Sequence, residues 1–159
     1  MGEVVLKASN ISKSYDNGDK TLSVLNDLSI QVEKNQIITI MGQSGSGKST
    51  LLNILGSLDK PDYGKVEIDG LNILDLNNYE IAKIRNQKIG FVFQFHHLLL
   101  EFTALENVLM PAWIGNSVTK KKDIAVNLFA ELNLSSKMDC YPNQLSGGER
   151  SRVALLRGI

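Results

Sequence analysis

The chain has 159 residues, of which 43% are hydrophobic and 21% are charged. This is the composition of a globular protein, and the length is enough for one hydrophobic core of domain size. Seventeen basic side chains balance 17 acidic ones, so the chain has no overall positive field for holding nucleic acid. No apolar stretch approaches the ~20 residues that span a bilayer, and the N-terminus lacks the pattern of a signal peptide. We therefore expect a soluble, cytosolic protein.

The first part of the chain is typical of β-strands, because apolar residues alternate or cluster in short runs between turn residues. The predicted strands are 4–8, 28–32 and 37–41, followed by a hairpin of 65–68 and 71–73 and a later strand at 89–93. The run 37–41 is apolar throughout, which predicts a strand buried on both faces. Asp69 and Gly70 favour the tight turn of the hairpin.

Helices are expected between and after these strands, and the second half of the chain is mainly helical. The predicted helices are 48–55, 77–86, 104–111, 119–132 and 149–156. Thr103 and Glu106 form a capping box at the start of the third helix, and we expect Pro111 to end it. In the fourth helix Ile124, Leu128 and Leu132 recur at helical spacing and predict its buried face.

Residues 42–50 read GQSGSGKST, which fills the phosphate-binding pattern G-x-x-x-x-G-K-[ST] between a predicted strand and a predicted helix. Backbone N–H groups can cradle a triphosphate only where no Cβ blocks their approach, and Gly42, Gly45 and Gly47 leave that space. Lys48 is expected to reach the β- and γ-phosphates, and the hydroxyl of Ser49 to bind Mg²⁺. We call residues 42–50 the phosphate loop.

The rest of the phosphate loop agrees with this reading. Its remaining candidate ATP contacts are Ser44, Ser46 and Thr50. A dinucleotide-binding G-x-G-x-x-G pattern is excluded because no third glycine follows at the required spacing. A glycine loop that only turns the chain remains the structural alternative.

A second motif places Ser146, Gly147, Gly148 and Glu149 at the start of the last predicted helix. A serine and two glycines at a helix N-terminus can meet an anion. Ser146 and Glu149 also fit a capping box, which can start a helix without any ligand. This motif alone leaves both readings open.

Together the two motifs resemble the ATP-binding cassette (ABC) family over nearly the whole chain. The resemblance implies a homodimer in which the LSGGE signature of one subunit closes over ATP held on its partner's phosphate loop. It implies that Tyr15 stacks on adenine, a contact worth ~1–3 kcal/mol. It also implies that Gln94 contacts Mg²⁺ and the attacking water. Gln94 and Lys48 are the candidate catalytic residues, although Tyr15 can also be read as a surface residue and Gln94 as a polar strand end.

Residues 90–111 look very like the ATPase subunit of lipoprotein-releasing transporters, whose relatives drive macrolide export or act in cell division. This implies a subunit on the cytoplasmic face of the inner membrane. It also implies that residues 95–102 contact integral membrane subunits through Phe95, Leu98, Leu99 and Phe102. Plain core packing is the alternative for each of these four side chains.

The implied fold is α/β: a P-loop NTPase of the ABC type with an antiparallel β subdomain and a helical subdomain. We expect residues 1–94 to form the ATP-binding core and residues 95–159 the helical subdomain with the signature. The family pattern continues with a strand ending in Asp-Glu and a switch histidine, and these 159 residues contain neither. We therefore expect a truncated chain without its C-terminal catalytic strands, with very weak hydrolysis, since positioning and electrostatics supply most of phosphoryl-transfer catalysis.

Other side chains that could carry chemistry have simpler readings. His96 and His97 are adjacent and point apart, without a third histidine or a second cysteine to complete a metal site. Cys140 is alone, so we expect it to be a half-buried small side chain.

Two other functions remain open at this stage. One is a soluble ABC protein of translation or DNA repair, although a second cassette and a long coiled-coil insertion are both missing from these residues. The other is a nucleotide-binding remnant that does not hydrolyse ATP.

Overall fold

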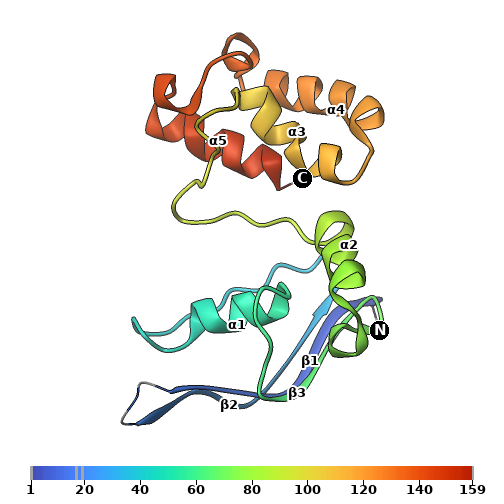
Figure 1. Ribbon diagram of the computed structural model, residues 1–159, viewed down its shortest axis with the longest axis vertical. Helices are drawn as coiled ribbons and strands as arrows, with labels where there is room; N and C mark the ends of the chain where they lie inside the picture. The colour runs from blue at the N-terminus through green and yellow to red at the C-terminus, as the bar shows by residue number, and fades with distance from the viewer. Residues whose placement is uncertain (1, 17, 19, 159) are drawn as a thin grey trace. The chain divides into compact units, whose positions relative to one another are not determined.

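The computed structural model describes residues 2–16, 18 and 20–158. They form two compact units, which divide within α2 (Asn78–Lys88), between Ile81 and Ala82. The first unit is built on a β-sheet and the second is helical (Figure 1). The functional boundary that the sequence suggests after Gln94 stays a prediction.

The sheet of the first unit has four antiparallel strands in the order β2-β1-β3-β4 (Figure 1). The strands are β1 (Val4–Asp16), β2 (Thr21–Glu33), β3 (Tyr63–Ile68) and β4 (Leu71–Asn72). The predicted strands at 4–8 and 28–32 are parts of much longer ones, and the hairpin is confirmed. Asp69 and Gly70 both have positive φ, at 49° and 77°, as the favoured two-residue hairpin turn requires.

Helix α1 (Lys48–Leu55) completes the first unit and confirms the predicted helix. It buries Leu51, Ile54 and Leu55. The sheet contributes further buried apolar side chains, which are Ala8, Ile11, Leu25, Val66 and Ile68. Alternate residues of β3 are therefore buried, as expected for a sheet with one covered face.

Two predicted strands, 37–41 and 89–93, are wrong, because neither segment has strand conformation. Ile37 is 94% exposed and Met41 is 85% exposed, where the sequence predicts burial on both faces. A parallel strand needs neighbours for its backbone N–H and C=O groups. Neither segment joins the four-stranded sheet of the described residues, so neither forms a strand.

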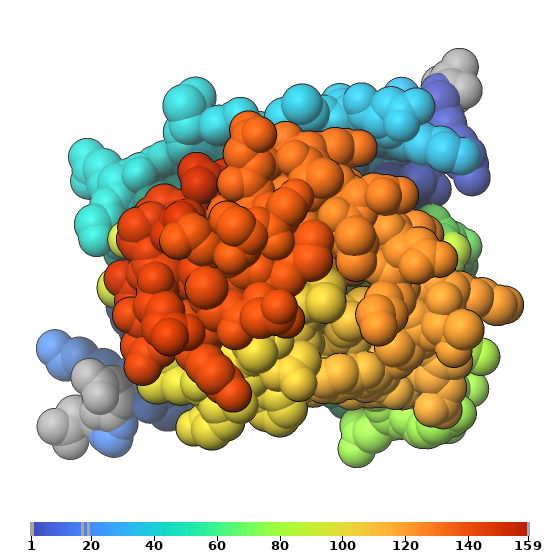
Figure 2. Space-filling model, turned by 90° about the horizontal axis from the view of Figure 1, so that it is seen from above, coloured from blue at the N-terminus to red at the C-terminus, as the bar shows by residue number. Residues whose placement is uncertain are grey.

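The helical unit contains α3 (Ala104–Ile114), α4 (Val118–Glu131) and α5 (Gly147–Arg157). The three helices pack against one another, and Figure 2 looks onto α4 in orange and α5 in red, with the yellow segment that includes α3 beside them. Three short 3-10 helices complete the two units, namely η1 (Ile73–Asp75), η2 (Ser135–Lys137) and η3 (Pro142–Gln144). Phe129, Leu134 and Val153 are fully buried in the core of the helical unit.

The helix predictions hold with two corrections. Pro111 lies inside α3, which continues to Ile114. Proline removes one backbone hydrogen bond, but Leu109 and Ala112 on either side of it are buried, and their packing holds the last turn. In α4 the fully buried positions are Ala125 and Phe129, not the predicted Ile124, which is 55% exposed.

Cys140 fits its predicted role. It is half-buried and packs against the core of the helical unit.

Candidate functional site

The phosphate loop turns sharply into α1. Gly45 and Gly47 have φ of 80° and 84°, a left-handed conformation that side chains with a Cβ rarely adopt. A Cβ on Gly47 would lie 2.9 Å from Val24 Cγ1 and 3.0 Å from the Val24 carbonyl oxygen. Gly47 is the N-cap of α1, and no side chain caps it. The first turn of α1 therefore keeps backbone N–H groups available for an anion.

The Lys48 ammonium group lies inside the phosphate loop. Its Nζ donates to the carbonyl oxygens of Gly42 and Gln43, at 2.8 and 2.6 Å, and lies 3.4 Å from Ser46 Oγ. A positive charge is thus held by weak neutral acceptors beside uncapped N–H groups. A phosphate is a stronger acceptor than these carbonyls, so the arrangement fits a polyphosphate.

Tyr15 lies in the same unit as the phosphate loop, near the end of β1. Its hydroxyl donates to Asp59 Oδ2 at 2.8 Å, and its side chain also interacts with Thr50 in the first turn of α1. The hydrogen bond to the Asp59 carboxylate raises the pKa of Tyr15, with burial as a smaller cause. The structure therefore brings Tyr15 next to the helix that follows the phosphate loop.

Gln94 and the signature residues belong to the helical unit. Gln94 is exposed and lies in a bend directly after residues 89–93. Ser146 caps α5: its Oγ accepts from the Glu149 N–H at 3.3 Å, and Glu149 Oε2 accepts from the Ser146 N–H at 2.7 Å. The capping box is confirmed. The hydrogen bond from the Ser146 backbone is the largest cause of the lowered pKa of Glu149.

The two signature glycines border open space. A Cβ on Gly147 would meet no atom within 4 Å, and a Cβ on Gly148 would meet only Arg152 Nη1, at 4.0 Å. Packing within the chain therefore gives no reason for either glycine. Their missing side chains leave the first turn of α5 accessible from outside.

Sequence patterns missed the contacts that hold the segment after Gln94. His96 Nε2 lies 3.1 Å from the Gly147 carbonyl oxygen and 3.0 Å from Ser151 Oγ. Arg157 donates to the backbone carbonyl oxygens of His96, at 2.9 Å, and His97, and burial lowers the pKa of its guanidinium. These contacts join residues far apart in the chain, so no local spacing could indicate them.

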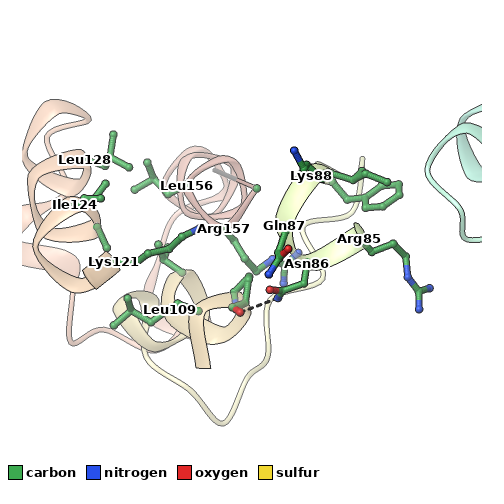
Figure 3. Close-up of a pocket in the computed structure, with 18 of the residues that line it drawn as sticks. Arg85, Asn86, Gln87, Lys88, Leu109, Lys121, Ile124, Leu128, Leu156 and Arg157 are labelled. Carbon is green, nitrogen blue, oxygen red and sulfur yellow. Dashed lines mark hydrogen bonds between the residues drawn. The ribbon is translucent and has the colours of Figure 1, made fainter. Parts of the chain in front are cut away.

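The helical unit also contains a cavity of about 620 Å³ (Figure 3). Lys121, Ile124 and Leu128 of α4 line one side, and Leu156 and Arg157 of α5 another. Its wall includes a very close approach of two glycines, since a Cβ on Gly90 would clash with the carbonyl of Gly158. No sequence pattern indicated this cavity.

The four side chains expected to meet a membrane subunit do not line this cavity. Phe95 is 73% exposed and Leu99 is 41% exposed. Leu98 packs against the helical core, and the half-buried Phe102 ring lies 6.2 Å from the ring of Trp113. Phe95 and Leu99 are therefore the more exposed pair, and Leu98 and Phe102 are half-buried.

The described residues form neither a metal-binding cluster nor a membrane-spanning helix. No group of three or more His, Cys, Asp or Glu side chains in residues 2–16, 18 and 20–158 could hold a metal ion. Within the same residues, every helix is too short or too polar to cross a membrane.

Comparison with known proteins gives concordant matches. Residues 25–159 match the family model described as ABC transporter. The chain is 49% identical to the lipoprotein-releasing system ATP-binding protein LolD of Shewanella oneidensis and 48% identical to that of Saccharophagus degradans. Each alignment covers all of this chain and 70% of the relative.

Two solved structures of the bacterial ABC transporter cassette MJ0796 also match. The chain resembles a dimeric structure with a TM-score of 0.88 at 38% identity. It resembles a dimeric post-hydrolysis state bound to ADP and Pi with a TM-score of 0.85 at 40% identity. Both matches cover 97% of this chain and 68% of the other. The chain therefore has the α/β fold of a P-loop NTPase cassette and belongs to the ABC transporter family.

Proposed function

We propose that this chain is the ATP-binding part of a subunit that powers a lipoprotein-releasing transporter. The observation that carries the proposal is the Lys48 ammonium group held inside a glycine loop at the uncapped start of α1. The similarity to LolD proteins over the whole chain supports lipoprotein release as the process that this ATP binding would power.

ATP binding would use the residues of the phosphate loop in distinct ways. The backbone N–H groups of the loop would cradle the phosphates, and Lys48 would neutralise part of their charge. These N–H groups belong to the candidate contacts Gly42, Ser44, Gly45, Ser46, Gly47, Ser49 and Thr50. Tyr15, beside Thr50, would stack on the adenine.

Mg²⁺ would accompany the nucleotide and spread the charge of the phosphates. The chain offers Ser49 and Gln94 as its ligands. A hydroxyl and an amide oxygen suit this hard cation, which usually keeps several waters and phosphate oxygens among its ligands. Gln94 would also orient the attacking water.

The signature would act on a second subunit. Gly147 and Gly148 leave the first turn of α5 open, and a helix N-terminus favours an anion. We propose a homodimer in which Ser146, Gly147, Gly148 and Glu149 face the nucleotide of the partner subunit. The dimeric structures of MJ0796 support this arrangement.

A membrane partner would bind the segment 95–102. Phe95 and Leu99 expose apolar surface there, which a protein partner could cover. The subunit would then lie on the cytoplasmic face of the inner membrane, held by integral transporter subunits.

ATP hydrolysis is proposed for the whole protein, since the chain spans about 70% of the LolD relatives. The 159 residues contain no apolar strand ending in Asp-Glu and no histidine outside the pair at 96 and 97. In the proposed hydrolysis, the groups that polarise the attacking water would therefore lie outside these 159 residues.

The first test is calorimetric titration of the chain with ATP and Mg²⁺. Lys48→Ala removes a charged contact worth about 1.5–3 kcal/mol, so ATP affinity should fall about 10- to 100-fold. Lys65→Ala removes an exposed lysine of β3 in the same unit and should leave affinity unchanged. Equal ATP affinity in the wild type and Lys48→Ala would overturn the proposal.

The second test is purification from native membranes. A tagged chain should recover integral transporter subunits, and Phe95→Asp should reduce the recovery because it puts a charge into an apolar contact. Recovery of ribosomes or DNA without any membrane protein would contradict the transporter assignment.

A further inference from the structure

Tyr15 is held by a cluster of charged side chains that no sequence motif indicated. Asp59, which follows α1, lies at the centre of this cluster. Its Oδ2 accepts from the Tyr15 hydroxyl at 2.8 Å, and its Oδ1 accepts from Lys13 Nζ at 3.2 Å and from the Lys60 backbone N–H at 2.7 Å. Both carboxylate oxygens are thus engaged, and the carboxylate cannot turn without breaking several hydrogen bonds.

Lys13 holds the other side of the cluster. Its side chain is only 12% exposed, and its Nζ donates to the Lys60 carbonyl oxygen at 2.7 Å and lies 3.6 Å from Asp62 Oδ1. The same Nζ lies over the Tyr15 ring, 5.2 Å from its centroid, within the range of a cation–π contact. Lys13 therefore occupies one face of the aromatic ring.

Asp62 also fixes the backbone next to the ring. Its Oδ2 accepts from the Ser14 N–H at 2.7 Å, and its own N–H donates to the Ser12 carbonyl oxygen at 2.9 Å. The strand segment that carries Tyr15 is thereby tied to the loop that carries Asp59. Ring, hydroxyl and backbone are each held by a separate contact.

The same contacts favour the charged forms of Asp59 and Lys13. Burial acts to raise the pKa of Asp59, but hydrogen bonds from Tyr15, Lys60 and Lys13 outweigh it and lower the pKa. Burial acts to lower the pKa of Lys13, but Asp59 and Asp62 outweigh it and raise the pKa. Both groups are therefore charged at neutral pH.

We infer that Asp59 and Lys13 are positioning residues that hold the Tyr15 ring ready to stack on a nucleobase. Tyr15 is 42% exposed, so the ring keeps surface for a base while Lys13 covers one face. A ring fixed before binding loses little conformational freedom on stacking, which raises affinity. The inference rests on the proposed ATP binding and concerns only the contact with the base.

The experiment compares two ligands that differ in the base. ATP carries phosphates and adenine, and inorganic tripolyphosphate carries phosphates alone. Asp59→Ala releases the Tyr15 hydroxyl and the Lys13 ammonium group together, so ATP affinity should fall about fivefold, part of one base-stacking contact. Tripolyphosphate affinity should not change, because the phosphate loop is untouched. Asp75→Ala, at an exposed carboxylate of the same unit, is the matched control and should alter neither affinity.

A second variant keeps the inference testable if Asp59→Ala does not fold. Tyr15→Phe removes one oxygen atom and leaves the ring, so it should weaken ATP in the same direction without affecting tripolyphosphate. A drop of equal size for both ligands, or no drop for ATP in either variant, would overturn the inference. Lys48→Ala separates it from the proposed function, since that variant should weaken both ligands, and unchanged binding of both would overturn ATP binding itself.

Discussion

Replacement of Asn107 should destabilise the helical unit more than any surface substitution. Asn107 is a fully buried polar residue of α3. Its Oδ1 accepts from the Leu99 N–H at 2.8 Å. Its Nδ2 lies 2.9–3.0 Å from the backbone carbonyl oxygens of Leu99, Phe102 and Thr103. One side chain thus ties the loop before α3 to the helix.

The size of the effect follows from these contacts. The amide accepts one hydrogen bond and has two N–H hydrogens for three carbonyl oxygens, which amounts to about three hydrogen bonds. Each contributes about 1 kcal/mol net, so Asn107→Ala should lower the free energy of unfolding by about 3 kcal/mol. Asn107→Asp has the same shape but turns a negative oxygen toward three carbonyl oxygens. At pH 7 the free energy of unfolding should therefore fall further in Asn107→Asp than in Asn107→Ala. The difference should shrink as the pH falls toward about 4, because the carboxyl becomes protonated.

Urea denaturation followed by tryptophan fluorescence measures this loss, because Trp113 is the only tryptophan and lies on α3. Asn127→Ala, at an exposed position of α4, is the control and should cost little. A loss below about 1 kcal/mol for Asn107→Ala, or a stable Asn107→Asp variant at pH 7, would refute the reasoning.

Two further predictions concern other parts of the chain. The pKa of Glu149 is lowered from 4.5 chiefly by the Ser146 backbone N–H, so its contribution to stability is present above pH 4.5 and is lost as the pH falls through the lower folded value. The protection factors of the amides in the first turn of α5, which are exchange rates corrected for the intrinsic pH dependence of exchange, should therefore fall on acidification by more than in a Glu149→Gln variant, and an equal fall in both would contradict this. Ile37→Lys and Met41→Lys should reduce light scattering of concentrated protein, because both side chains are exposed and apolar on a segment without strand partners. Unchanged scattering with an intact circular dichroism spectrum would show that aggregation begins elsewhere.

Motifs that depend on neighbouring residues were predictable. Hydrogen bonds that close within three residues need only the correct local sequence, and the capping boxes at Thr103 and Ser146 formed as expected. The turn at Asp69 and the left-handed glycines of the phosphate loop follow from the same local rules. The family could also be identified, because its motifs are short and contiguous.

Strand pairing was not predictable from the same patterns. The apolar run 37–41 has the composition of a buried strand, yet a strand exists only where a neighbour satisfies its backbone. The opposite error occurred at Pro111, where buried neighbours outweigh a local helix breaker. In both places a long-range interaction, or its lack, decided the outcome.

The sequence by itself determined the phosphate loop, the helix starts and the family, because each depends on residue types at fixed short spacings. Only the tertiary structure revealed how Tyr15 is held and how His96 meets the start of α5. Asp59 lies 2.8 Å from the Tyr15 hydroxyl although 44 residues separate them in the chain. Contacts of this kind depend on how the backbone folds, and the periodicity and spacing of residues in the sequence do not indicate which distant residues meet.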